Sequence, residues 1–93
     1  MKLKISRGFL QKLEKQIDFI AKDKPGAARK FKNELLTRIK EITGMPFKNR
    51  KSVFFDRDDI RDLVFKGYVT VYKVNQEGQE IEVFGFVKYE AKL

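Results

Sequence analysis

The chain has 93 residues, which is enough for one domain with a single hydrophobic core. It has no cysteine and no histidine, which excludes a disulfide framework, thiolate chemistry and the usual imidazole base or zinc ligand. With 21 basic and 13 acidic residues its net charge is +8, so we expect an anionic partner: nucleic acid, an acidic protein or a membrane surface. The alternative is a lysine-rich surface with no partner, because net charge alone does not define a site.

The sequence predicts a cytoplasmic protein that does not associate with a membrane. No apolar run approaches the roughly 18–20 residues that a membrane-spanning helix needs. The first residues lack the apolar core of a signal peptide. The absence of cysteine also fits a reducing compartment.

The N-terminal half predicts a strand followed by a helical hairpin. Residues 2–6 alternate polar and apolar side chains, as in a strand with one buried face. Ser6 is a suitable N-cap for a helix that continues to about Lys22, with apolar residues spaced three and four apart. Pro25 suits the first position of a second helix, which should end near Thr43 before a glycine and a proline.

The C-terminal half predicts three antiparallel strands. Residues 60–89 contain three runs rich in β-branched and aromatic residues, separated by Lys66-Gly67 and by a polar loop at 75–78. Gly67 can take the positive φ of a tight hairpin. A further apolar run, Val53-Phe54-Phe55, predicts another short strand. We therefore predict an α+β fold of order β-α-α-β-β-β, with residues 1–93 forming one domain.

The last predicted strand is apolar on both faces. Strict alternation places Ile81, Val83, Gly85 and Val87 on one face, and Glu82, Phe84, Phe86 and Lys88 on the other. Such a strand is expected to be covered on both sides. If the second face is not covered within the monomer, Phe84 and Phe86 form a patch that binds a partner.

The acidic cluster at residues 56–62 has two interpretations. Asp56, Asp58, Asp59 and Asp62 could bind a hard cation. Arg57 and Arg61 alternate with them, which favours an ion-paired turn instead. Because the six glycines are scattered, the sequence also lacks a glycine-rich phosphate loop, and we expect no metal and no cofactor.

Basic residues of the second helix and of the segment after it could form a phosphate-binding stripe if they share a face. These residues are Arg29, Lys30, Lys32, Arg38, Lys40, Lys48, Arg50 and Lys51. The three tyrosines, Tyr68, Tyr72 and Tyr89, could stack on the bases of single-stranded RNA. Alternatively, Tyr68 and Tyr72 pack on the helices from one face of their strand.

Several stretches together resemble the RelE/ParE superfamily of bacterial toxins over essentially the whole chain. They are the strand, the helical hairpin with Pro25-Gly26-Ala27-Ala28-Arg29-Lys30-Phe31, Pro46, Ile60-Arg61-Asp62-Leu63-Val64, and Gly67-Tyr68-Val69-Thr70-Val71-Tyr72-Lys73-Val74. The resemblance implies a toxin of a type II toxin–antitoxin pair, neutralised by a cognate antitoxin. It also implies one of two activities: ribosome-dependent mRNA cleavage, as in RelE-like members, or inhibition of DNA gyrase, as in ParE-like members.

The residues at the positions of the nuclease motif favour the ParE-like activity. Nuclease members commonly carry an arginine where this chain has Val69, and basic residues near Ile60 and Asp62. Lys88-Tyr89 does match the C-terminal end of some nuclease members. If the chain were a nuclease, the resemblance would make Arg61, Lys88 and Tyr89 the catalytic residues.

The charge and apolarity of other residues suggest which of them meet other molecules. Basic residues expected to contact the target, gyrase or the ribosome with its mRNA, are Lys48, Arg50, Lys51 and Arg57. Phe84 and Phe86 are expected to bind the antitoxin, an acidic amphipathic segment that folds on binding. A degenerate member that has lost toxicity is a third possibility.

Overall fold

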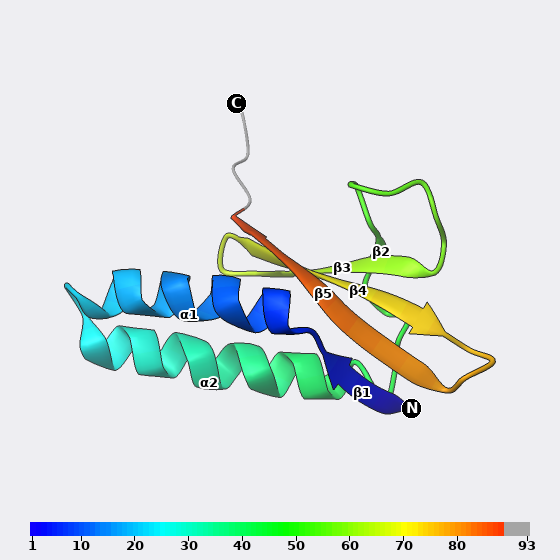
Figure 1. The fold of residues 1–93 in the computed structure, drawn as a ribbon, viewed down its shortest axis with the longest axis horizontal. Helices are drawn as coiled ribbons and strands as arrows, with labels where there is room; N and C mark the ends of the chain where they lie inside the picture. The colour runs from blue at the N-terminus through cyan, green and yellow to red at the C-terminus, as the bar shows by residue number, and fades with distance from the viewer. Residues whose placement is uncertain (89–93) are drawn as a thin grey trace.

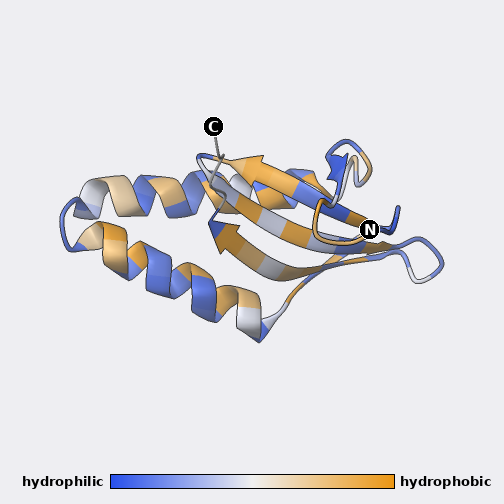
Figure 2. Ribbon diagram, turned by 90° about the horizontal axis from the view of Figure 1, so that it is seen from above, coloured by the Kyte–Doolittle hydropathy of each residue, from blue (hydrophilic) through white to orange (hydrophobic). Residues whose placement is uncertain are grey.

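The computed structural model describes residues 1–88 and has two helices packed on one face of a five-stranded sheet (Figure 1). Its elements are β1 (Lys2–Ile5), α1 (Arg7–Ala21), α2 (Pro25–Glu41), β2 (Arg50–Lys51), β3 (Ile60–Phe65), β4 (Tyr68–Asn75) and β5 (Glu80–Lys88). Figure 2 shows largely hydrophobic strands, whereas the helices alternate between hydrophobic and hydrophilic residues. The predicted α+β architecture is confirmed.

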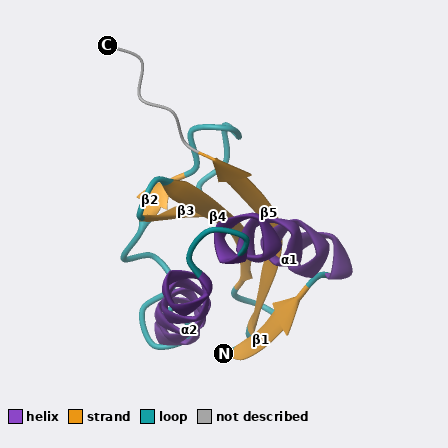
Figure 3. Ribbon diagram, turned by 90° about the vertical axis from the view of Figure 1, so that its left-hand side faces the viewer, coloured by secondary structure: helices purple, strands orange, loops and turns teal. Residues whose placement is uncertain are grey.

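The strands lie in the order β1-β5-β4-β3-β2, with β1 parallel to β5 and every other pair antiparallel. The predicted meander of β3, β4 and β5 is confirmed. Lys66 and Gly67 both have positive φ, 48° and 82°, as the two-residue β3–β4 turn requires. The helical hairpin connects β1 to the rest of the chain, and in Figure 3 α2 lies below β2 and β3 while α1 lies beside β5.

The helix boundaries follow from local signals. The Ser6 hydroxyl accepts a hydrogen bond from the N–H of Phe9 at 3.1 Å, so the predicted N-cap of α1 is confirmed. Pro25 occupies the first turn of α2. Helix α2 ends at Glu41, two residues before the predicted end. Neither helix in the described residues is long and apolar enough to cross a membrane.

The predicted strand at Val53–Phe55 is wrong. Besides β4, β3 pairs with Arg50–Lys51, which lie in the basic segment after the second helix. The buried carboxylate of Asp62 accepts the N–H of Val53 at 2.9 Å, which turns the chain away from the sheet.

A β-bulge in β5 changes which side chains face the helices. Val71 pairs with Gly85 and Tyr72 pairs with Val83, so Phe84 is an extra residue without a partner. Phe86 therefore joins the core beneath the helices, whereas Phe84 lies on the opposite face. The prediction that Phe84 and Phe86 share a face is wrong, because alternation is interrupted at the bulge. A Cβ on Gly85 would lie 3.0 Å from Cβ of Val71, so the close strand approach favours glycine there.

Helices and sheet enclose one main apolar core. It includes Phe9, Leu13, Phe31, Leu35, Ile39, Tyr72, Ile81, Val83 and Phe86. Tyr68 stacks on Phe86 with ring centroids 5.3 Å apart, and Tyr72 is fully buried. The interpretation that Tyr68 and Tyr72 pack on the helices is therefore confirmed, while Tyr89 lies outside the described residues.

Candidate interaction surfaces

The sheet face opposite the helices is only partly covered. The β2–β3 loop, residues 52–59, folds over one end of it, and Phe55 meets Phe84 edge-on with ring centroids 5.8 Å apart. Beneath lies a small cluster of Ile60, Val69 and Val71. Apolar side chains remain around it, all exposed except the half-buried Phe84, and we call the set the open sheet face: Val53, Phe54, Phe55, Val64, Phe84 and Val87.

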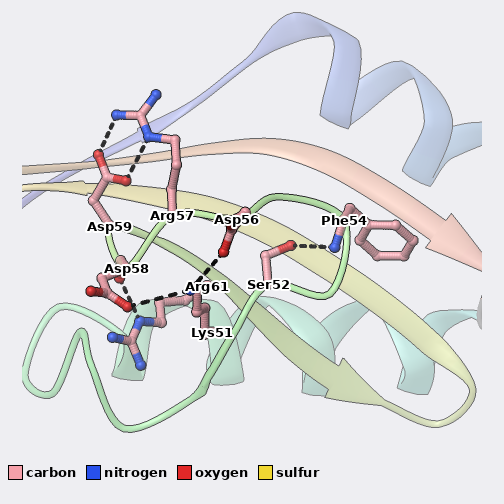
Figure 4. A network of polar contacts seen from close by, with 8 residues as sticks. All are labelled: Lys51, Ser52, Phe54, Asp56, Arg57, Asp58, Asp59 and Arg61. Carbon is pink, nitrogen blue, oxygen red and sulfur yellow. Dashed lines mark hydrogen bonds and ion pairs between the residues drawn. The ribbon is translucent and has the colours of Figure 1, made fainter.

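Polar contacts hold the β2–β3 loop in place. The Asp62 side chain is fully buried, and besides the N–H of Val53 it meets the guanidinium of Arg50 at 3.4 Å. The Ser52 hydroxyl accepts the N–H of Phe54 at 3.2 Å (Figure 4). The loop therefore presents its aromatic residues from a fixed backbone.

Residues 56–59 of this loop, which we call the charged turn, are ion-paired, as predicted (Figure 4). Arg57 donates two hydrogen bonds to the Asp59 carboxylate, at 2.9 and 2.6 Å. This contact is the main cause of the lowered pKa of Asp59. The Lys51 ammonium lies 3.0 Å from Asp56 and 3.8 Å from Asp58, and the hydrogen bond to Asp56 raises the pKa of Lys51. Lys51 and Arg57, two of the predicted target-contact residues, are thus already paired with carboxylates of this loop.

Arg61 connects the β2–β3 loop to the segment between α2 and β2. Its guanidinium lies 4.9 Å from the centre of the Phe47 ring and donates to the backbone carbonyls of Asp58 and Asn49, at 2.8 and 3.2 Å. Arg61 pairs with Tyr72, whereas Lys88 pairs with Tyr68, four residues away along β4. At roughly 3.3 Å per residue, Arg61 and Lys88 are about 13 Å apart along the sheet and also two strands apart.

The predicted nuclease residues are therefore not brought together within residues 1–88. Val69, at the position where nuclease members have an arginine, is fully buried in the cluster under the open sheet face. Tyr89, the third predicted catalytic residue, lies outside the described residues.

A groove runs between α2 and β3. It consists of two hollows of about 400 and 260 Å³ that share Arg38 and Glu41, and we call it the α2 groove. The Arg38 guanidinium lies over the Phe65 ring, 5.4 Å from its centre. Lys48, the fourth predicted target-contact residue, lines the second hollow. The groove was not predicted, because it depends on how far α2 stands from β3.

Tyr72 holds the segment after α2 that lines the smaller hollow through Lys48 and Asn49. Its hydroxyl donates to the Pro46 carbonyl at 2.7 Å and accepts from the Asn49 amide at 3.1 Å. Burial raises the pKa of Tyr72, so the hydroxyl remains a donor. The open sheet face and the α2 groove offer contact area rather than a nucleophile beside a base, which suits binding of another macromolecule.

Comparisons with known proteins agree with this arrangement. A family model described as the ParE toxin of the type II toxin–antitoxin system parDE matches residues 3–90. The fold is similar to that of a chromosomal ParDE system from P. aeruginosa, with a TM-score of 0.79, 18% identity and 97% of each chain covered. It is also similar to the isolated E. coli RelE toxin, with a TM-score of 0.65 and 18% identity over 98% of this chain and 86% of that chain. Curated protein sequences give no match.

The two structural likenesses, at 18% identity, establish the fold. The family model adds the assignment, because it spans nearly the whole sequence, and the resemblance to the RelE/ParE superfamily is confirmed in favour of its ParE-like branch. The chain belongs to the family of ParE toxins of type II toxin–antitoxin systems.

Proposed function

We propose that this toxin inhibits DNA gyrase in the bacterial cytoplasm and is held inactive by an acidic antitoxin. The observation that carries the choice of gyrase over mRNA is the separation of the predicted nuclease residues within a ParE-family fold. RNA cleavage needs a base for the 2′-hydroxyl and cations around one phosphate. Two of the five Arg61 N–H donors bond to the backbone carbonyls of Asp58 and Asn49. Buried Val69 occupies the position where nuclease members have an arginine.

Ribosome-dependent mRNA cleavage is the second candidate. It is favoured by the likeness to the RelE fold and by the exposed position of Lys88 at the end of β5. In that case Arg61 would have to leave its bonds to the Asp58 and Asn49 carbonyls, and Lys88 would have to approach it.

For the antitoxin we propose the open sheet face as the main contact. Its exposed apolar side chains belong to a chain of net charge +8, which suits an acidic segment with an apolar face that folds as it binds. Phe84 is half-buried there and can still contact a partner. Phe86 does not contribute to this surface, because it is only 7% exposed beneath the helices.

For gyrase we propose a contact at the end of the α2 groove that includes Lys48. In the described residues Lys48 makes no ion pair, whereas Lys51 and Arg57 are paired within their own turn and Arg50 faces Asp62. The charged turn would then shape the neighbouring backbone rather than supply free cations.

The test is to induce the chain in a bacterium and pulse-label DNA, RNA and protein synthesis during the first minutes. We expect DNA synthesis to fall first, and the purified chain to inhibit supercoiling by purified gyrase. Lys48→Glu should weaken this inhibition more than Lys2→Glu, a matched charge reversal on β1. An early fall of protein synthesis with unaffected supercoiling would instead establish the nuclease. Continued growth with all three syntheses intact would point to a degenerate toxin.

A further inference from the structure

Half of the net charge lies on one end of the helical hairpin. Residues 12–32 contain seven basic and three acidic residues, a net +4 of the chain's +8, in less than a quarter of the sequence. They form the second half of α1, the connection to α2 and the first half of α2. Figure 1 shows that the end of the hairpin where α1 connects to α2 projects beyond the sheet.

Most of these cations are not neutralised by the protein itself. Lys32 pairs with Glu14 at 3.1 Å, and Lys30 lies 3.9 Å from Glu34. The others are exposed and make no ion pair within residues 1–88, and we call them the hairpin cations: Lys12, Lys15, Lys22, Lys24 and Arg29. The contrast with the charged turn is direct, because Lys51 and Arg57 there have carboxylate partners.

Helical spacing places three of the hairpin cations in one row. Lys12, Lys15 and Lys22 follow one another at intervals that keep them on the same face of α1. At 1.5 Å per residue the row is about 15 Å long. Lys24 and Arg29 continue the positive surface where α2 begins, and the first turn of α2 contains no acidic residue to offset it.

The predicted stripe on the second helix shares only Arg29 with the hairpin cations. Arg38 faces the α2 groove over the Phe65 ring, and Lys30 and Lys32 are paired with glutamates. The five hairpin cations, which make no ion pair within residues 1–88, instead lie on the part of the hairpin formed by residues 12–32. This surface therefore depends on the packing of α1 beside α2.

We propose that the hairpin cations form a sequence-independent contact surface for the phosphate backbone of duplex DNA. Duplex DNA carries one negative charge about every 1.7 Å, so a rigid row of about 15 Å faces several phosphates at once. A protein partner would find little apolar area to bury here, because the large apolar side chains exposed on the described part of the hairpin are Leu10 and Phe19. A single-stranded nucleic acid would need several aromatic side chains on which its bases could stack. The proposal stands whether or not gyrase is the target.

The test measures binding of the purified full chain to a short fluorescein-labelled duplex of mixed sequence by anisotropy, between about 50 and 200 mM salt. We expect a Kd on the order of 10⁻⁶ M at the low-salt end and a slope of log K against log salt of about −4 to −5. The triple variant Lys12→Gln, Lys15→Gln, Lys22→Gln should make the slope shallower by about 2.7, since each lost phosphate contact removes about 0.9. Glutamine keeps the helix propensity of lysine, and thermal melting checks that the variant is folded.

The matched control is the triple variant Lys2→Gln, Lys4→Gln, Lys73→Gln, which removes the same charge from the sheet. An equal loss of slope in both variants would overturn the proposal, because binding would then follow net charge rather than a located surface. Failure of the unmodified chain to bind the duplex at low salt would also overturn it. Poly-L-glutamate is the third probe: if it binds as tightly as DNA and is lost in the hairpin variant, the surface fits an acidic protein and the assignment to DNA is wrong.

Discussion

The two faces of the sheet are covered by different means. Two helices cover one face and enclose a continuous apolar core, whereas the β2–β3 loop covers part of the other through a few directional contacts. Apolar burial is non-directional and tolerates small shifts, while a loop held by one carboxylate depends on that group. The helix-covered face therefore provides the stability, and the open sheet face keeps exposed apolar side chains for a partner.

Phe84 and Phe86, two residues apart on β5, test this difference when each is replaced by alanine. Phe86→Ala removes a ring from the main core and should lower the free energy of unfolding by about 3–5 kcal/mol. Phe84→Ala removes a half-exposed ring from the other face and should cost about 1 kcal/mol. Urea unfolding of both variants measures the two values. Equal losses would mean that the open sheet face is as important for folding as the core.

Asp62→Ala should have the next largest effect and should act on the loop. It leaves the N–H of Val53 without its acceptor and should cost about 2 kcal/mol, because the Arg50 partner is 39% exposed and its contribution is screened. Amide exchange at Val53 should become faster, while exchange in α1 should follow only the global change. Asp62→Asn is the control, because it keeps an acceptor oxygen. If asparagine is as harmful as alanine, the charge facing Arg50 matters more than the bond to Val53.

The comparison also separates what the sequence could predict from what it could not. The elements of the helix-covered face depend on local signals, such as the cap at Ser6, the proline at position 25 and the glycine at position 67, and these predictions are confirmed. The open sheet face depends on relations between strands. Alternation alone could not reveal the bulge that separates Phe84 from Phe86, because the extra residue is defined only by pairing with β4.

The candidate site was less predictable for the same reason. Asp62 was grouped with exposed carboxylates, but it is buried under the loop that it holds, ten residues away from the Ser52 that begins that loop. The family resemblance made Arg61 a candidate catalytic residue. In the structure two of its N–H groups instead bond to backbone carbonyls of two loops. Predicting the α2 groove would have required the distance between α2 and β3, which no residue pattern encodes.

Tyr72→Phe tests a polar contact made from the helix-covered face. Losing the bond to the Pro46 carbonyl should cost about 1 kcal/mol at neutral pH. Burial raises the pKa of Tyr72 above its ordinary value of 10.0, so the folded state holds the proton more tightly than the unfolded chain. This contribution is complete below pH 10.0 and is lost as the pH rises towards the folded pKa.

Urea unfolding at neutral pH and at about pH 11 checks this prediction. The advantage of the unmodified chain over Tyr72→Phe should shrink at the higher pH, and lysine deprotonation is common to both proteins and cancels in the difference. A difference that stays constant with pH would show that Tyr72 titrates alike in the folded and unfolded chains.

The smallest effect is expected at the tip of the loop, in Arg57→Gln. The hydrogen bond from Arg57 lowers the pKa of Asp59 below 3.8, so its contribution is present above that pH and is lost as the pH falls through the folded pKa. In the variant the pKa of Asp59 should return towards 3.8, although Lys73 still lowers it slightly, and NMR titration of the carboxyl carbon measures this. Stability at neutral pH should hardly change, since the pair is exposed and screened by salt. The Asp59 carbonyl also accepts the N–H of Val74 at 2.7 Å, so the turn keeps its backbone anchor in the variant. A large loss of stability would mean that side-chain charge holds the loop as firmly as Asp62 does, and the open sheet face would then have two anchors.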